Sequence, residues 1–203
     1  MIEGVCDGNG VWREEGDFIE MVFVDYYAEL FKSSNPSNFS EVLEVVQPKV
    51  FESMNARLTR EFQVEDVHRA IKQMYLLKAL GPDGMPPLFF QHFWSVVGGI
   101  VTKTVLGFLN LGIIPPKFNN THIVLIPKSK NPRYVTEYRP ISLCNVVYKL
   151  ASKTLANRLK KFLPSIISES QSAFVNGRLI KNNVIVAFET MHHINQKKRR
   201  GQG

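Results

Sequence analysis

The chain has 203 residues, of which 44% are hydrophobic and 21% are charged, which fits a folded domain and excludes global disorder. Its net charge of +7 is uneven, because residues 1–70 hold 14 acidic and 6 basic residues while residues 71–203 hold 4 acidic and 19 basic ones. The second part, at +15, indicates a polyanionic partner, and two cysteines exclude a disulfide framework or a cysteine-based zinc site.

Helical spacing of apolar residues predicts the elements of the first half of the chain. Helices are expected over 17–31, 64–77 and 87–111, and the last of these should be a core helix because it is rich in aromatic residues. A buried helix is also favoured over a membrane span for 96–114, since that stretch carries Lys103 and Asn110. The apolar residues near helical spacing are Phe18, Met21, Val22, Tyr26 and Leu30 in the first helix, and those on one face of the second are Val67, Ile71, Met74 and Leu77.

Gly81-Pro82-Asp83-Gly84 predicts a tight turn, because proline presets φ and glycine accepts positive φ. Further on, short apolar runs predict buried strands over 123–126 and 138–143. The expected hairpin-like connection between them is cationic, with one acid, Glu137. Arginine and lysine at such a tip could clamp a triphosphate or a nucleic-acid backbone, and charge alone leaves a solvated loop as the alternative.

The clearest amphipathic helix is expected over 146–163, ending at Pro164. Lys149, Lys153 and Lys160 fall on one stripe of this helix, where they could follow a phosphate backbone or simply form a solvated face. The apolar stripe is expected to comprise Val147, Leu150, Leu155, Leu159 and Phe162.

The C-terminal part predicts a strand and turn over 171–177 and a last helix capped by Asn182 or Asn183. Phe174 could stack on a base or belong to the core. The residues of the last helix expected to face inward are Val184, Ala187, Phe188 and Met191. Taken together, these elements predict a helix-rich α+β fold.

Carboxylates are scarce in the basic part of the chain. Between residues 71 and 203 they are Asp83, Glu137, Glu169 and Glu189, each isolated in sequence. Two-metal phosphoryl transfer requires several carboxylates that converge on the ions. The basic part could therefore assemble such a site only if these four residues converged in space.

Five ordered blocks carry a family resemblance. They are Lys78–Gly84 (KALGPDG), Ile126–Pro132 (IPKSKNP), Tyr138–Asn145 (YRPISLCN), Leu155–Leu159 (LANRL) and Gln171–Arg178 (QSAFVNGR). In this order they resemble motifs of non-LTR (LINE-type) retrotransposon reverse transcriptases, especially the plant ones. Leu80 stands where this family usually has proline.

The resemblance implies the fingers and the start of the palm of an incomplete right-hand polymerase. It implies that Lys128 and Arg139 bind the triphosphate of the incoming nucleotide. It also implies that Gln171, Phe174 and Arg178 lie near the template. The implied partners are an RNA template, an RNA–DNA duplex, a deoxynucleotide triphosphate and the remainder of the polymerase, with no membrane.

The resemblance further suggests two segments: 1–77 as an acidic, mostly helical linker, and 78–203 as the N-terminal part of a reverse transcriptase domain. The family's metal-binding Asp motifs, which use Mg²⁺, are expected beyond residue 203. The chain alone is therefore expected to hold no metal or catalytic residue and to be inactive, in the cytoplasm or nucleus rather than secreted. Two alternatives stay open: a non-catalytic nucleic-acid-binding module, and a non-functional product of a decayed retroelement.

Overall fold

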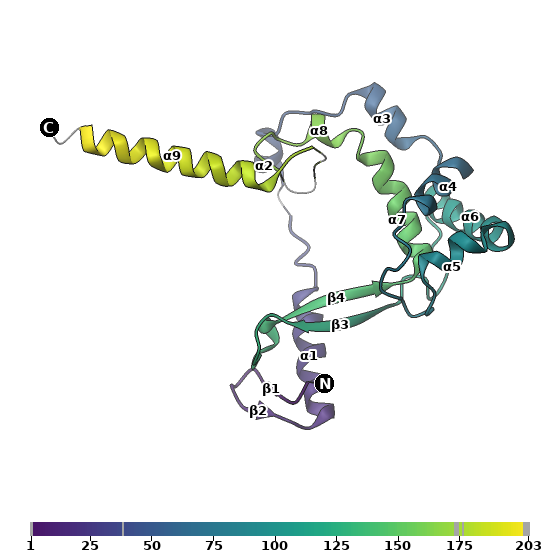
Figure 1. The fold of residues 1–203 in the computed structure, drawn as a ribbon, viewed down its shortest axis with the longest axis horizontal. Helices are drawn as coiled ribbons and strands as arrows, with labels where there is room; N and C mark the ends of the chain where they lie inside the picture. The colour runs from purple at the N-terminus through teal and green to yellow at the C-terminus, as the bar shows by residue number, and fades with distance from the viewer. Residues whose placement is uncertain (1, 38, 173–174, 176, 201–203) are drawn as a thin grey trace. The chain divides into compact units, whose positions relative to one another are not determined.

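The computed structural model describes residues 2–37, 39–172, 175 and 177–200 of the chain. The described part is helix-rich with two small sheets, in agreement with the expected α+β class (Figure 1). In chain order the elements are β1 (Val5–Cys6), β2 (Trp12–Arg13), α1 (Gly16–Leu30), α2 (Ser40–Glu44), α3 (Glu52–Thr59), α4 (Val64–Lys72), α5 (Pro87–His92), α6 (Trp94–Leu111), β3 (Thr121–Pro127), the 3₁₀-helix η1 (Val135–Glu137), β4 (Tyr138–Cys144), α7 (Val146–Leu159), α8 (Leu163–Ile166) and α9 (Ile180–Arg200).

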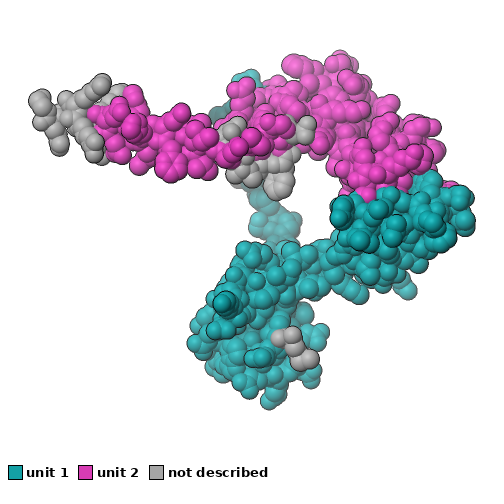
Figure 2. Space-filling view, viewed as in Figure 1, with its two compact units in different colours: residues 1–47, 75–97, 114–149 teal, residues 48–74, 98–113, 150–203 magenta. Residues whose placement is uncertain are grey.

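The chain forms two compact units, coloured separately in Figure 2. Unit 1 comprises residues 1–47, 75–97 and 114–149, and unit 2 comprises residues 48–74, 98–113 and 150–203. Each unit is therefore built from three separate stretches of the chain. The division at residue 77, which the family resemblance suggests between a linker and a polymerase segment, stays a prediction.

The core of unit 1 joins the N-terminal residues to the second strand of the hairpin. It contains Val5, Ile19, Phe23, Tyr27, Val135 and Tyr138. Phe23 makes an edge-to-face contact with Tyr138 at a centroid distance of 5.1 Å. The backbone amide of Cys6 also donates a hydrogen bond to the carbonyl of Arg133, at 2.7 Å.

Helix α1 has the expected extent, but the apolar residues noted at helical spacing are not the ones that it buries. The residues it buries are Ile19, Phe23 and Tyr27, whereas Phe18, Met21, Tyr26 and Leu30 are exposed. Apolar residues occur on almost every side of this helix, so its periodicity does not fix its rotation. Packing against Val135 and Tyr138 selects the face.

Strands β3 and β4 form the expected antiparallel hairpin, with Ile126 opposite Arg139 and Thr121 opposite Cys144. The prediction that these strands are buried was wrong. Ile123 is 48% exposed and Ile126 is 46% exposed. The reason is that this sheet has only two strands in the described structure, so a ribbon replaces the covered sheet that the apolar run suggested.

The turn at Gly81–Gly84 is present and lies against the end of β4. Gly84 has φ +65° and its amide donates to the carbonyl of Gly81 at 3.0 Å. The amide of Asp83 donates to Oδ1 of Asn145 at 3.2 Å, and the ammonium of Lys149 donates to the carbonyl of Ala79 at 2.8 Å. The turn is thus attached to the residues that follow β4.

The long helix expected over 87–111 is two helices, α5 and α6. The break is at Phe93, which has φ −96° and ψ 23° and is exposed. Of the described helices, α6 alone has the length and apolar composition of a membrane-crossing segment, and 22% of it is buried. The expectation of a core helix is therefore met only by the face that carries Gly98, Val101, Thr102 and Val105.

Unit 2 corrects several expected faces. In α4, Val67 and Ile71 are buried as expected, as is Met74 just beyond its end, but Leu77 is 72% exposed because the helix ends at Lys72. Helix α7 and its continuation bury Leu150, Ala151, Thr154 and Phe162 and expose Leu155 and Leu159. Val184, Phe188 and Met191 of α9, expected to face inward, are all exposed. The described residues of 171–177 form no strand, unlike the prediction.

Candidate nucleic-acid and nucleotide interface

One end of the β3–β4 ribbon carries both Lys128 and Arg139. Arg139 lies in β4 opposite Ile126, and Lys128 directly follows the last residue of β3, where its amide donates to the carbonyl of Glu137 at 2.7 Å. Both residues are exposed, and the Arg139 side chain has no hydrogen-bond or ion-pair partner among the described residues. This end of the ribbon therefore offers two accessible cations to an anionic ligand.

The connection that carries Lys128 is ordered by a carboxylate. Oε2 of Glu137 accepts hydrogen bonds from the amides of Arg133 at 2.6 Å and Tyr134 at 3.0 Å. The ammonium of Lys128 donates to the carbonyl of Thr136 at 2.6 Å, which leaves two of its three protons free. Glu137, which the sequence shows only as the one acid among cations, is thus the residue that shapes the cationic connection.

Acid should loosen this connection. The two amide hydrogen bonds, from Arg133 and then Tyr134, hold the pKa of Glu137 below its usual 4.5, and the Arg133 charge adds to this. The contribution of Glu137 to stability is therefore present above pH 4.5 and is lost as the pH falls through the lowered pKa. NMR titration should show the amide signals of Arg133 and Tyr134 shifting with a midpoint below 4.5. In Glu137→Gln this transition should be missing, and a midpoint at or above 4.5 in the wild type would contradict the expectation.

The lysine stripe of α7 is only partly available. At 100° per residue, Lys149, Lys153 and Lys160 lie within about 40° of one another around the helix axis. The ammonium of Lys149 already donates to the carbonyl of Ala79, while Lys153 is half-buried and Lys160 is exposed. The stripe exists as a surface feature, and its contact with a nucleic acid stays a prediction.

Arg178 is hydrogen-bonded to backbone carbonyls of residues that precede it in the chain. The guanidinium of Arg178 donates to the carbonyls of Ser168, Gln171 at 2.7 Å, and Pro164 and Ile167 at 3.2 Å each. Gln171 is exposed, and Phe174 lies outside the described residues. Arg178 therefore organises the loop after α8, and the template contacts expected of Gln171, Phe174 and Arg178 stay predictions.

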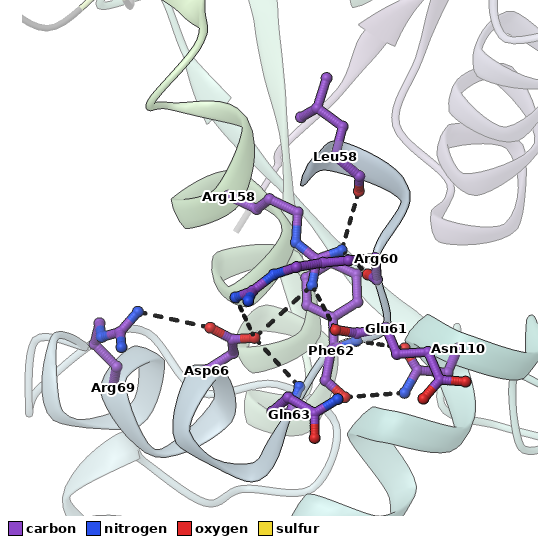
Figure 3. A network of polar contacts seen from close by, with 9 residues as sticks. All are labelled: Leu58, Arg60, Glu61, Phe62, Gln63, Asp66, Arg69, Asn110 and Arg158. Atoms are coloured by element: carbon purple, nitrogen blue, oxygen red, sulfur yellow. Dashed lines mark hydrogen bonds and ion pairs between the residues drawn. The ribbon is translucent and has the colours of Figure 1, made fainter. Parts of the chain in front are cut away.

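Arg158 lies at the centre of a polar network in unit 2 that the sequence did not reveal (Figure 3). Its Nη1 donates to the carbonyls of Leu58, at 3.0 Å, and Arg60, and its Nη2 donates to the carbonyl of Glu61 at 3.2 Å. The guanidinium stacks on the Phe62 ring at 3.2 Å from the centroid. Arg158 thereby connects α7 to the segment between α3 and α4.

Asp66 supplies the negative charge of this network. Its carboxylate lies 3.6 Å from Arg60, 3.6 Å from Arg69 and 3.8 Å from Arg158. Burial lowers the pKa of the Arg158 guanidinium, Asp66 opposes this shift, and the like charge of Arg60 adds to it. The sequence gives no signal for these contacts, because most acceptors of Arg158 are backbone carbonyls about 100 residues earlier.

Two comparisons with known proteins agree with the sequence motifs. Residues 126–202 match the family model of the reverse transcriptase (RNA-dependent DNA polymerase). The chain is also 29% identical over 169 residues to an uncharacterized 149 kDa protein of transposon TX1 from Xenopus laevis. That alignment covers 82% of this chain but 13% of the relative, so the chain corresponds to a small part of the length of the protein it resembles.

The matched region includes the last two residues of β3, all of β4 and α7, Arg178 and all of α9. The cations predicted from the motifs to bind the nucleotide, Lys128 and Arg139, both lie in it. The plant-like character expected from the motifs is not supported by either comparison. Residues 126–202 are therefore similar to reverse transcriptases, and most of the chain is similar to a small part of a transposon-encoded protein.

Proposed function

We propose that this chain supplies the nucleotide- and template-binding fingers, and the start of the palm, of a reverse transcriptase. The observation that carries this proposal is the pair of exposed cations, Lys128 and Arg139, at one end of the β3–β4 ribbon. In the proposed role, the Arg139 guanidinium binds two phosphate oxygens and the Lys128 ammonium acts as a mobile point charge. These contacts orient the triphosphate of an incoming deoxynucleotide.

Catalysis by the polymerase family uses Mg²⁺, and the described residues do not fit such a site. No group of three or more His, Cys, Asp or Glu side chains converges among them. The carboxylate of Glu137 is hydrogen-bonded to two backbone amides of its own turn. We therefore derive no metal-dependent step, and we propose that the 203-residue polypeptide binds nucleotide without incorporating it.

Nucleotide binding tests the proposal directly. Lys128→Ala and Arg139→Ala should each weaken binding of a fluorescent deoxynucleotide triphosphate by about ten- to a hundredfold, since a charged hydrogen bond contributes about 1.5–3 kcal/mol. Lys32→Ala removes an exposed cation of unit 1 that pairs with Glu29, and it should leave the affinity unchanged. Equal affinity of all four proteins would refute the role of the ribbon.

Primer extension tests the second half of the proposal. The purified chain, supplied with an RNA template, a DNA primer, Mg²⁺ and deoxynucleotides, should give no extension product. Incorporation that co-purifies with the chain and is missing from a mock preparation would contradict this expectation.

A non-catalytic nucleic-acid-binding module is the second candidate. The +15 charge of residues 71–203 and the exposed Lys160 favour it. Binding to single-stranded RNA that falls steeply with salt, together with no measurable nucleotide affinity, would favour this module over the nucleotide-gripping role.

A further inference from the structure

Unit 2 contains a pocket with a large excess of positive charge. It has a cavity volume of about 170 Å³ and is open to solvent. The charged residues that line it come from α3, α4, α7 and the segments beside them, and they are Arg57, Arg60, Asp66, Arg69, Arg158 and Lys161. Five cations thus surround one carboxylate, which gives the lining a net charge of +4.

The single carboxylate cannot neutralise this set. Asp66 is in reach of Arg60, Arg69 and Arg158, at 3.6–3.8 Å, and is shared among all three (Figure 3). Arg158 also donates hydrogen bonds to backbone carbonyls. These bonds occupy its protons but leave its positive charge in the wall of the pocket. The wall therefore attracts a further anion.

Several donors in the lining stay accessible to such an anion. The side chains of Arg60 and Arg69 are 59% and 55% exposed, and Lys161 is exposed. Each guanidinium has five protons in a planar fork, so one weak ion pair with Asp66 leaves most of them free. These donors can bind oxygens on more than one side of a ligand.

A buried neutral donor points to the same conclusion. Asn157 lines the pocket, and its Nδ2 is buried with no hydrogen-bond partner among the described residues. A buried amide group without an acceptor destabilises the ligand-free protein. Acceptor oxygens of a ligand in the pocket would satisfy it, whereas a cation would not.

The lining is also held in place before any ligand binds. The Arg57 guanidinium stacks on the Phe162 ring at 5.3 Å from the centroid. Arg158 fixes the backbone of Leu58, Arg60 and Glu61. A site whose donors are fixed in advance loses less conformational entropy on binding.

We propose that this pocket binds a backbone phosphate of a nucleic-acid strand. A phosphodiester is an oxyanion whose oxygens match the guanidinium fork, and the open pocket admits a group carried on a longer chain. The choice of a nucleic acid over a free phosphate compound rests on the proposed function. None of the pocket residues belongs to the β3–β4 ribbon, so the two sites are distinct in sequence and can be tested separately.

The test compares two pairs of charge-removing substitutions in unit 2. Arg69→Gln with Lys161→Gln removes two accessible cations from the pocket, and Lys72→Gln with Lys103→Gln removes two exposed cations outside it. With a fluorescein-labelled single-stranded RNA, the first pair should weaken binding about tenfold and lower the salt slope by about one to two units. The second pair should change the affinity less than twofold. Equal losses in both pairs, or no loss in the first, would overturn the proposal.

A substitution that removes a negative charge from the pocket distinguishes an effect on RNA binding from an effect on folding. Asp66→Asn removes the one negative charge of the lining and should tighten RNA binding by about threefold or more. A variant that merely unfolds would lose affinity instead. Weaker or unchanged binding by a folded Asp66→Asn protein, as judged by circular dichroism, would count against the pocket.

Inorganic phosphate distinguishes the source of the anion. If the pocket serves a nucleic acid, millimolar phosphate should compete with RNA in the wild type and compete less in the Arg69→Gln/Lys161→Gln protein. Thermal protection by phosphate, without any effect of the pocket variants on RNA binding, would overturn the nucleic-acid assignment. The nucleotide assay on Lys128 and Arg139 is independent of these readouts, so failure of either proposal can be recognised on its own.

Discussion

Arg158→Ala should destabilise unit 2 by about 3–5 kcal/mol, the largest effect that the structure predicts. The substitution leaves the carbonyls of Leu58, Arg60 and Glu61 without their donor and uncovers the Phe62 ring. Urea unfolding followed by circular dichroism should show the loss. Hydrogen exchange should show it most clearly as faster exchange in α4, whose start follows this segment.

Two further variants define the cause. Arg158→Lys keeps the charge but replaces the planar fork with one ammonium, so it should recover less than half of the loss. Lys103→Ala removes an exposed cation of α6 and should change stability by less than about 0.5 kcal/mol. Full recovery by lysine would show that charge alone matters, and a wild-type stability of Arg158→Ala would refute the anchoring role.

Gly81→Ala should destabilise unit 1 by about 2–3 kcal/mol, because its new methyl group meets backbone that cannot turn aside. A Cβ at this position would lie 2.5 Å from the carbonyl oxygen of Cys144 and 2.6 Å from the amide nitrogen of Asn145. Relief requires separation of the turn from the end of β4, with loss of the Asp83–Asn145 and Lys149–Ala79 hydrogen bonds. The thermal midpoint of the purified chain measures this effect.

Gly8→Ala is the matched control. Gly8 also lies in unit 1, yet a Cβ there would meet no atom within 4 Å. Its substitution should leave the midpoint almost unchanged. If both variants had the same thermal midpoint as the wild type, the close approach of Gly81 to β4 would be disproved.

The turn predicted at residues 81–84 explains only part of why glycine is required at position 81. The sequence predicts a turn at residues 81–84, and the turn is present. Positive φ is required at Gly84. At Gly81 the requirement is space against Cys144, a contact between residues more than 60 positions apart that no local pattern encodes.

The β3–β4 hairpin shows which features follow from neighbouring residues in the sequence and which depend on tertiary packing. The run of apolar residues, the cationic connection and the second run predict β3, β4 and their antiparallel pairing. The nucleotide-binding role of Lys128 and Arg139 came from the family resemblance of the motifs, and it stays a prediction. The exposure of Ile123 and Ile126 could not, since it depends on whether other elements cover the ribbon.

The phosphate pocket could not be predicted from sequence. Arg57, Arg60 and Arg69 belong to the N-terminal part, whose net negative charge gives no indication of a cationic site. Arg158, near the end of α7, and Lys161, just after it, are close in sequence to the predicted lysine stripe but line the pocket instead. Only folding brings the two groups to one pocket.

The sequence by itself determined the helix-rich α+β class, the hairpin, the Gly81–Gly84 turn and the similarity of residues 126–202 to reverse transcriptases. These follow from local periodicity, turn chemistry and motif order. The tertiary structure decided which faces of α1 and α7 are buried, that the described side chains of α9 are exposed, and what Arg158 binds. The physical reason is that helices with apolar residues on many sides have no unique inward face, and that backbone carbonyls, which every residue has, leave no trace in the sequence.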